Sequence, residues 1–197
     1  YRLISMLKQI LILGLLVNSA VAVADWRVDP EGSHIGFASV KNDMIAENHT
    51  FTEVAGRVSA TGAAEISITL ASVETLIPIR NERMQTLLFN IAEFPMASVR
   101  SQVPTHELAT MNTGESRVLN IDIVIDLHGA GVKKTVPVKV TSLGSDSFDV
   151  SSLGPIVVHA SQFALSDNVE ALRKIAGLQS IDLMVPVTFD LRLVAAD

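Results

Sequence analysis

The sequence predicts an all-β domain, an antiparallel β-barrel with one or two short helices at one end. Apolar and polar residues alternate with the period of two that is typical of half-buried strands. Turn signals separate these segments, and they do not alternate with helices as they would in a parallel α/β sheet. An antiparallel sandwich shares these signals. Aromatic residues make up only 5% of the chain, so the inward faces are largely aliphatic, which is compatible with a barrel that keeps space inside it.

Residues 1–24 predict a secretory signal peptide. Arg2 and Lys8 give a basic start, residues 10–17 form a short apolar run, and small residues precede an A-x-A ending at Ala24. A membrane-spanning helix needs about 20 apolar residues, more than this run offers. A buried N-terminal helix is the alternative. We therefore expect a single barrel domain over residues 25–197 and, in a bacterium, a periplasmic protein.

The net charge narrows the choice of partners, and the absence of cysteine limits how the fold can be stabilised. The formal net charge of −6 would become −8 once Arg2 and Lys8 are removed. Such a surface repels nucleic acid and anionic headgroups, so no nucleic-acid partner is expected. Because the chain has no cysteine, the fold has to rely on its hydrophobic core without disulfide bonds.

The first half of the chain predicts short strands. Residues 26–29 form one strand, and Pro30-Glu31-Gly32 is interpreted as a turn. Residues 33–41 alternate, with Ile35 and Phe37 on one face. Residues 44–58 are less regular, and residues 65–75 form a further strand after a turn of small residues.

The spacing of apolar residues changes from that of a strand to that of a helix within residues 72–95. Met84, Leu87, Leu88 and Ile91 recur at helical spacing, which predicts a helix over residues 82–91, and Asn81 is a candidate N-cap. We interpret this segment as lying at the mouth of the barrel. The apolar face of the helix is expected mainly to pack against the rim.

The second half returns to strands. The alternation predicts that Ile123, Val138 and Val185 point inward and that a hairpin turns at residues 129–131. A second short helix is expected to end at Gly177. The predicted strands are residues 96–103, 117–128, 132–141, 147–150, 156–160 and 181–194, the second helix is 166–176, and residues 106–115 form a polar loop.

No motif in the sequence predicts catalysis, a metal site or a cofactor. There is no cysteine, no G-x-S-x-G and no H-E-x-x-H, and the five histidines are scattered. His34 and His128 lie on outward faces of their strands. A metal site assembled from distant strands stays open as an alternative. Gly129-Ala130-Gly131 lies between two strands, so it is a hairpin turn and not a phosphate-binding loop.

Arg80, Glu82 and Arg83 form a charged cluster around the start of the predicted helix. One interpretation is a solvated helix start. The other is a cationic rim at the barrel mouth, where arginine forks would hold the polar head of a ligand whose apolar tail enters the lumen.

Several segments together resemble the YceI-like family of periplasmic proteins. These are WRVDPEGSHIGFASVK at 26–41, Phe51 with Gly56, SVET at 72–75, RNER at 80–83, Phe89-Asn90, Phe94-Pro95 and LHGAGVKKTVPV at 127–138. The resemblance covers residues 25–194. It implies a lipocalin-like antiparallel β-barrel with an elongated apolar cavity for a polyisoprenoid or an isoprenoid-tailed molecule such as a quinone.

The resulting hypothesis is a non-catalytic periplasmic carrier of an isoprenoid lipid or quinone-like ligand. A non-catalytic envelope scaffold with a filled barrel is the alternative, and an enzyme on the same barrel is the least supported. A membrane-associated redox partner is a further candidate, and the sequence assigns no oligomeric state. The predicted ligand-binding residues are Phe37, Arg80, Arg83, Leu87, Phe89, Phe94, Ile123, Val138 and Val185.

Overall fold

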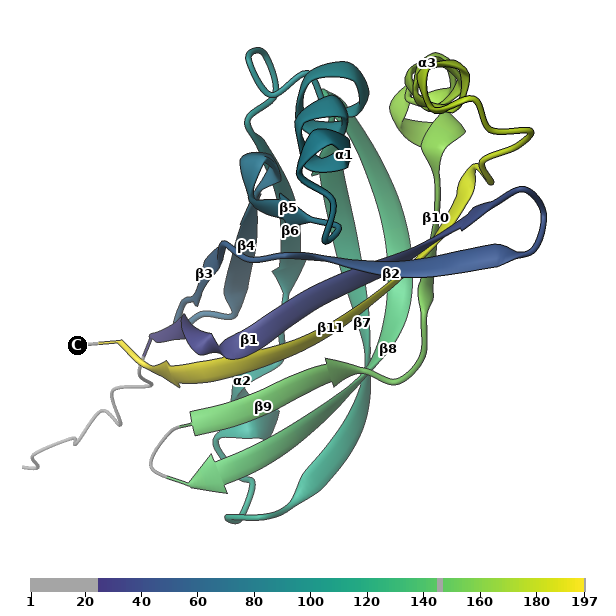
Figure 1. Cartoon of the computed structure of the whole chain (residues 1–197). Coiled ribbons are helices and arrows are strands. Elements are labelled where there is room, and N and C mark those ends of the chain that lie inside the picture. The colour runs from purple at the N-terminus through teal and green to yellow at the C-terminus, as the bar shows by residue number, and fades with distance from the viewer. Residues whose placement is uncertain (1–24, 145–146, 197) are drawn as a thin grey trace, which may run out of the picture.

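Eight strands close into an antiparallel barrel in the computed structural model, which describes residues 25–144 and 147–196. Each strand pairs with the next around the ring, and β11 pairs with β1 to close it (Figure 1). The predicted barrel is therefore confirmed, whereas the predicted signal peptide lies outside the described residues. In ring order the strands are β1 (Trp26–Lys41), β3 (Val54–Val58), β4 (Ala63–Thr69), β6 (Met96–Gln102), β7 (Ser116–Leu127), β8 (Ala130–Gly144), β9 (Ser147–Ser152) and β11 (Met184–Ala195).

Three further strands extend the sheet beyond the ring. Strand β2 (Ile45–Phe51) pairs with β1, and the two-residue strand β5 (Val73–Glu74) pairs with β2. On the other side, β10 (Ile156–His159) pairs with β11. The β1–β2 hairpin consequently projects beyond the barrel wall (Figure 1).

Short helices lie at both ends of the barrel. Helix α1 (Pro78–Arg83) continues into the π-helical turn η2 (Met84–Leu88), and these lie at the same end as α3 (Ser166–Ala176) (Figure 1). Helix α2 (Thr105–Leu108) covers the opposite end, where a polar loop was predicted. The remaining helical turns are η1 (Leu70–Ser72) and η3 (Ala160–Phe163). None of the helices within 25–144 and 147–196 has the length and apolar character needed to cross a bilayer.

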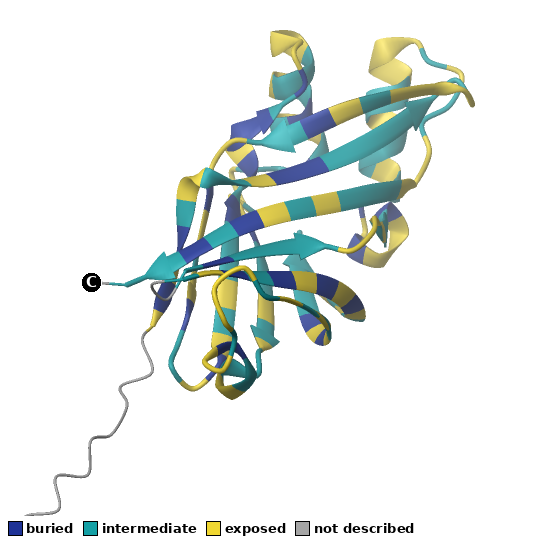
Figure 2. Ribbon diagram, turned by 90° about the horizontal axis from the view of Figure 1, so that it is seen from below, coloured by how far each residue is buried: buried dark blue, intermediate teal, exposed yellow. Residues whose placement is uncertain are grey.

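The core follows from the alternation along the strands. Ile121 and Ile123 of β7 and Val136, Val138 and Val140 of β8 are buried, while the residues between them face outward. Figure 2 shows the same alternation as bands of buried and exposed residues along the strands. Burying each such aliphatic side chain contributes about 1.5–3 kcal/mol, so the inward faces hold the barrel closed without disulfides.

Two predicted turns are wrong. Strand β1 continues through Pro30, Glu31 and Gly32, because both of its halves pair with β11 and a register shift between Asp29 and His34 absorbs the extra residues. The β7–β8 hairpin turns at His128 and Gly129. Both residues have positive φ, 51° and 77°, as a tight two-residue hairpin turn requires, so Gly131 already lies in β8.

Candidate ligand cavity and its polar mouth

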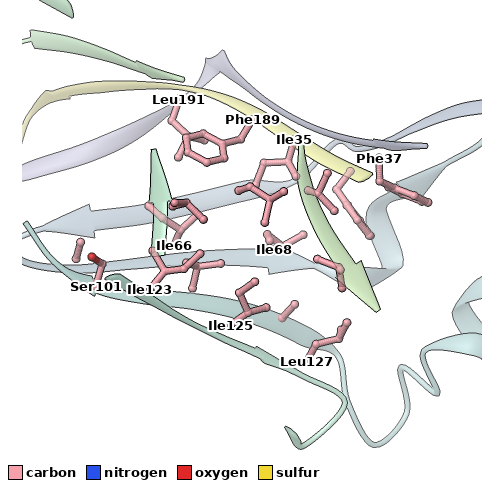
Figure 3. Close-up of a pocket in the computed structure, with 18 of the residues that line it drawn as sticks. Ile35, Phe37, Ile66, Ile68, Ser101, Ile123, Ile125, Leu127, Phe189 and Leu191 are labelled. Atoms are coloured by element: carbon pink, nitrogen blue, oxygen red, sulfur yellow. The ribbon is translucent and has the colours of Figure 1, made fainter. Parts of the chain in front are cut away.

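An apolar cavity occupies the inside of the barrel. Its volume, measured as the space that the centre of a water molecule can reach, is about 310 Å³. This volume is in the range of small-molecule binding pockets. Figure 3 shows side chains from opposite walls pointing into this space, among them Ile35, Ile66, Ile123 and Phe189. Ser101 is the one polar residue that lines the cavity within the described parts of the chain. The site therefore suits a hydrocarbon group.

The end of the cavity near α2 is closed by apolar side chains. Trp26, from the start of β1, and Leu108, from α2, both line the cavity and are almost fully buried. Trp26 also packs edge-on against Phe148, with ring centroids 5.9 Å apart. Ser101 lies in the same cross-strand row as Trp26, through Val58 and Ala64, so the one polar group of the lining among the described residues is at this end.

A row of rings leads from the cavity toward the other end. Phe89 lies 6.0 Å from Phe51, Phe51 lies 5.4 Å from Phe37, and Phe37 lies 5.1 Å from the ring of His49, measured between ring centroids. Phe37, Phe51 and Phe89 line the cavity. Phe37 and His49 are direct cross-strand partners on β1 and β2, so their side chains share the inner face of the hairpin. His49 packs behind Phe37 and is not part of the cavity lining.

His49 is a buried histidine with one ring nitrogen engaged. The side chain is 6% exposed, and Nε2 lies 2.9 Å from Ser39 Oγ. Burial, and after it the positive charge of Arg80, lowers the pKa of His49. The ring is therefore neutral at neutral pH, and its Nδ1 has no hydrogen-bond partner.

An ion-pair cluster flanks His49 at the mouth. Glu47 Oε2 lies 2.6 Å from Lys41 Nζ and 2.8 Å from Arg80 Nη1. The hydrogen bond from Lys41, followed by the charge of Arg80, outweighs burial and holds the pKa of Glu47 below its usual value. Arg80 Nη2 also donates to the carbonyl oxygen of Thr75 at 2.6 Å. Arg80 is therefore a tied structural group, not a free cation.

The segment before α1 is fixed by side-chain hydrogen bonds. Asn81 Oδ1 accepts from both the backbone N–H and the hydroxyl of Thr75, at 2.9 and 2.6 Å, and Asn81 Nδ2 donates to Glu74. Helix α1 begins earlier than predicted, at Pro78, with Ile77 as its N-cap residue, so Asn81 is not the N-cap. The chain turns at Leu76, which has φ of 63° and is 87% exposed.

The structure brings together some of the predicted ligand-binding residues and separates others. Phe37, Phe89, Ile123, Val138 and Val185 line the cavity.

The other four lie outside the lining. Arg80 is held by Glu47, and Arg83 lies on α1 without facing the cavity. Leu87 is 39% exposed, and Phe94 packs on the ring of His128 with a centroid distance of 4.3 Å. Phe94 instead contacts the β7–β8 turn, since it lies beside Gly129. In place of the predicted cationic rim, two cations, Lys41 and Arg80, share the single carboxylate of Glu47.

Sequence reasoning missed Lys41, Glu47 and His49. The alternation in β2 places Ile45, Glu47, His49 and Phe51 on one face. Phe51 points inward, so counting back from it by twos would have placed His49 on the inner face. Among residues 25–144 and 147–196, no three metal-binding side chains gather.

Comparisons with known proteins agree with this geometry. A model of the YceI-like domain matches residues 26–193. A solved polyisoprenoid binding domain from Saccharophagus degradans, implicated in plant cell wall breakdown, is 31% identical with a TM-score of 0.85, over 87% of this chain and 98% of that one. No curated protein matches.

Two more distant structures share the fold alone. BcnA from Burkholderia cenocepacia is 20% identical with a TM-score of 0.65, over 84% of this chain and 98% of its own. A YCEI protein from Campylobacter jejuni is 10% identical with a TM-score of 0.53, over 76% and 84%. The domain match spans nearly the whole described barrel, and the chain belongs to the YceI-like family.

Proposed function

We propose that this protein is an exported, non-catalytic carrier that holds an isoprenoid-tailed lipid, of the polyprenyl or quinone type, in its barrel. The observation that carries the proposal is the apolar cavity of about 310 Å³. A barrel that served only as a scaffold would fill this space with side chains. The Saccharophagus degradans relative, a polyisoprenoid binding domain, supports the choice of ligand class.

Mass spectrometry of lipid extracts tests the proposal. The protein is purified from the envelope of its native host without detergent, and the extract is compared with that of a Val138→Trp variant. Val138 lines the cavity, so tryptophan there occupies volume that a ligand would need. The control is Val118→Trp, because Val118 lies on the outward face of the neighbouring strand and is 58% exposed. Isoprenoid lipid in equal amount from all three proteins, or in none, would contradict a lumen carrier.

Exposed apolar residues at the helical end support exchange with a membrane. Leu76, Ile77 and Ile79 around the start of α1 and Ile175 on α3 are all exposed. Helices α1 and α3, with which these residues are associated, lie at the same end of the barrel (Figure 1). A ligand that resides in a bilayer has to reach the cavity from it, and a partly apolar mouth lowers the cost of that contact. Delivery to a membrane-associated redox partner is part of the same proposal.

Export is tested by cell fractionation. Release of a protein that begins near Asp25 by osmotic shock, established by N-terminal sequencing, is the expected result. A full-length chain retained in the cytoplasmic fraction would refute the periplasmic location but would not contradict lipid binding.

A further inference from the structure

Three charged side chains fasten α1 to the β1–β2 hairpin. Arg80 of α1 donates to Glu47 of β2 at 2.8 Å, and within the described residues this is the one hydrogen bond that joins α1 to the hairpin. Lys41 of β1 binds the same carboxylate at 2.6 Å. We call Lys41, Glu47 and Arg80 the clasp. Because two cations share one carboxylate, the clasp carries one net positive charge.

The clasp is connected to the helical end of the cavity. Helix α1 continues directly into the turn η2, and Met84, Leu88 and Phe89 from this turn and its C-cap line the cavity. A movement of α1 away from the hairpin would carry these side chains with it. The attachment of α1 therefore affects how far this end of the cavity is covered.

His49 lies beside the clasp. Its side chain is 6% exposed, and Nε2 is 2.9 Å from Ser39 Oγ. Glu47 and His49 are two residues apart on β2, so both face the inner side of the hairpin. Charged groups act on the ring from each element packed around it, namely Lys41 from β1, Glu47 from β2 and Arg80 from α1.

A proton added to His49 has no acceptor in this arrangement. The imidazolium carries an N–H on both ring nitrogens, and Nδ1 has no hydrogen-bond partner. The new charge would lie next to a clasp that is already positive, and burial would leave it poorly solvated. It would repel Arg80 or draw Glu47 away from Arg80. Either movement weakens the hydrogen bond that fastens α1.

The closed arrangement also leaves hydrogen-bonding groups unused. Among the described residues, the buried side-chain nitrogen and oxygen atoms without a partner are His49 Nδ1 and Arg80 Nε, and both belong to this group. Buried polar groups are nearly always paired, because an unpaired one lowers stability. Movement of α1 would admit water to both atoms, so the closed arrangement is poised to open.

We propose that His49 is a pH switch: protonation of its ring loosens Arg80 from Glu47, releases α1 from the β1–β2 hairpin and uncovers the helical end of the cavity in mildly acidic solution. The proposal concerns the closure of the cavity and does not depend on which ligand the cavity holds.

The two titratable groups of the site respond in different pH ranges. Burial, and after it the charge of Arg80, lowers the pKa of His49 from 6.5 in the closed state, whereas a hydrated ring titrates near its ordinary pKa of about 6.5. Closure is therefore complete above about pH 6.5 and weakens as the pH falls below it. The hydrogen bond from Lys41, followed by the charge of Arg80, lowers the pKa of Glu47 from 4.5, so the carboxylate stays ionised in this range.

Hydrogen exchange followed by mass spectrometry tests the switch in the ligand-free protein. Exchange over residues 76–89 is measured at about pH 7.5 and about pH 5 and is corrected for the intrinsic pH dependence of amide exchange. If the closed ring stays neutral at the lower pH, the opening equilibrium rises by up to about 30-fold. We expect the protection of α1 and η2 to fall by up to this factor, whereas that of β7 and β8 should not change.

Two matched variants isolate His49. His49→Gln does not titrate, so the protection of α1 should be equal at both pH values. His34 is an exposed histidine on the outward face of β1, and His34→Gln should keep the wild-type response.

Uptake of an uncharged fluorescent dye tests the consequence for the cavity. The association rate of N-phenylnaphthylamine is measured by stopped flow at the same two pH values. It should be higher at the lower pH in the wild-type protein and in His34→Gln, and independent of pH in His49→Gln. A rate independent of pH in the wild-type protein would refute the connection between the clasp and the cavity.

The outcomes separate this proposal from the carrier function. Equal protection of α1 at both pH values in the wild-type protein, or the same loss of protection in His49→Gln, overturns the switch and leaves the lumen carrier standing. Absence of dye uptake at both pH values contradicts the carrier, while hydrogen exchange still decides on the switch. If His49→Gln does not fold, an NMR titration of wild-type His49 decides instead. Residues of α1 must lose protection at the pH at which the ring is protonated, and an intact α1 beside a protonated His49 refutes the proposal.

Discussion

The cavity volume predicts how affinity depends on tail length. About 310 Å³ is open to the centres of water molecules, and one water requires about 10–15 Å³ by this measure, so the lumen holds about 20–30 water-sized groups. A methylene group is of similar size, so the lumen has room for a tail of about four to six five-carbon isoprene units. Each unit moved from water into the lumen gains at most about 4 kcal/mol, at roughly 0.8 kcal/mol per carbon. Affinity should therefore rise with each unit up to this length and then level off.

Val138→Trp shifts the point at which affinity levels off. Tryptophan adds about seven non-hydrogen atoms to the lumen, roughly one isoprene unit by the same volume measure. We expect the plateau to come about one unit earlier than in the wild-type protein. Displacement of an environment-sensitive dye by geraniol, farnesol, geranylgeraniol and longer polyprenols measures it, with thermal unfolding of each variant as a check on folding.

Val118→Trp is the matched control for this series. Val118 is exposed on the outer face of β7, so the same substitution there should leave the plateau unchanged. A plateau at the same length in Val138→Trp and wild type would show that the tail does not lie in the lumen. Affinity independent of tail length would refute the reasoning from volume as a whole.

Three further predictions concern the mouth. Arg80→Ala removes the hydrogen bonds to Glu47 and to a backbone carbonyl. It should lower the free energy of unfolding by about 1–3 kcal/mol in urea titrations, whereas Arg83→Ala should change it by less than about 0.5 kcal/mol. Equal effects of the two substitutions would contradict the structural role of Arg80. Leu76 has φ of 63° and an exposed side chain, so Leu76→Gly should raise the melting temperature, with a gain of up to about 1 kcal/mol, and a lower melting temperature would argue against backbone strain. The pKa of His49 is lowered from 6.5 in the folded protein. The contribution of His49 to stability is therefore complete above pH 6.5 and is lost as the pH falls through the folded pKa. His49→Gln should remove this part of the pH dependence of stability, and an unaltered profile would contradict the prediction.

Much of the barrel could be predicted because alternation is a local signal with one physical cause. In β7, each second residue faces the lumen, so the inward aliphatic face is visible in the sequence itself. The prediction of residues 117–128 differs from the observed Ser116–Leu127 by one residue at each end. The lining residues Ile123 and Val138 followed from the same rule.

Two of the mispredicted features depend on partners far away in the sequence. Pro30-Glu31-Gly32 has the composition of a turn, but pairing of both flanking segments with β11 keeps the strand continuous. The residues around Arg80 predict a free cation near a helix start, but its partner Glu47 belongs to a hairpin 33 residues earlier. Local patterns report which face a residue takes in a strand and do not report which charged groups become neighbours.

The lumen, and not the charged cluster at the mouth, dominates ligand binding. Arg80 and Lys41 share one carboxylate, that of Glu47, and neither residue lines the cavity, so the apolar lumen supplies most of the binding free energy. The length of the tail that fits into the lumen thus sets how tightly a ligand is held.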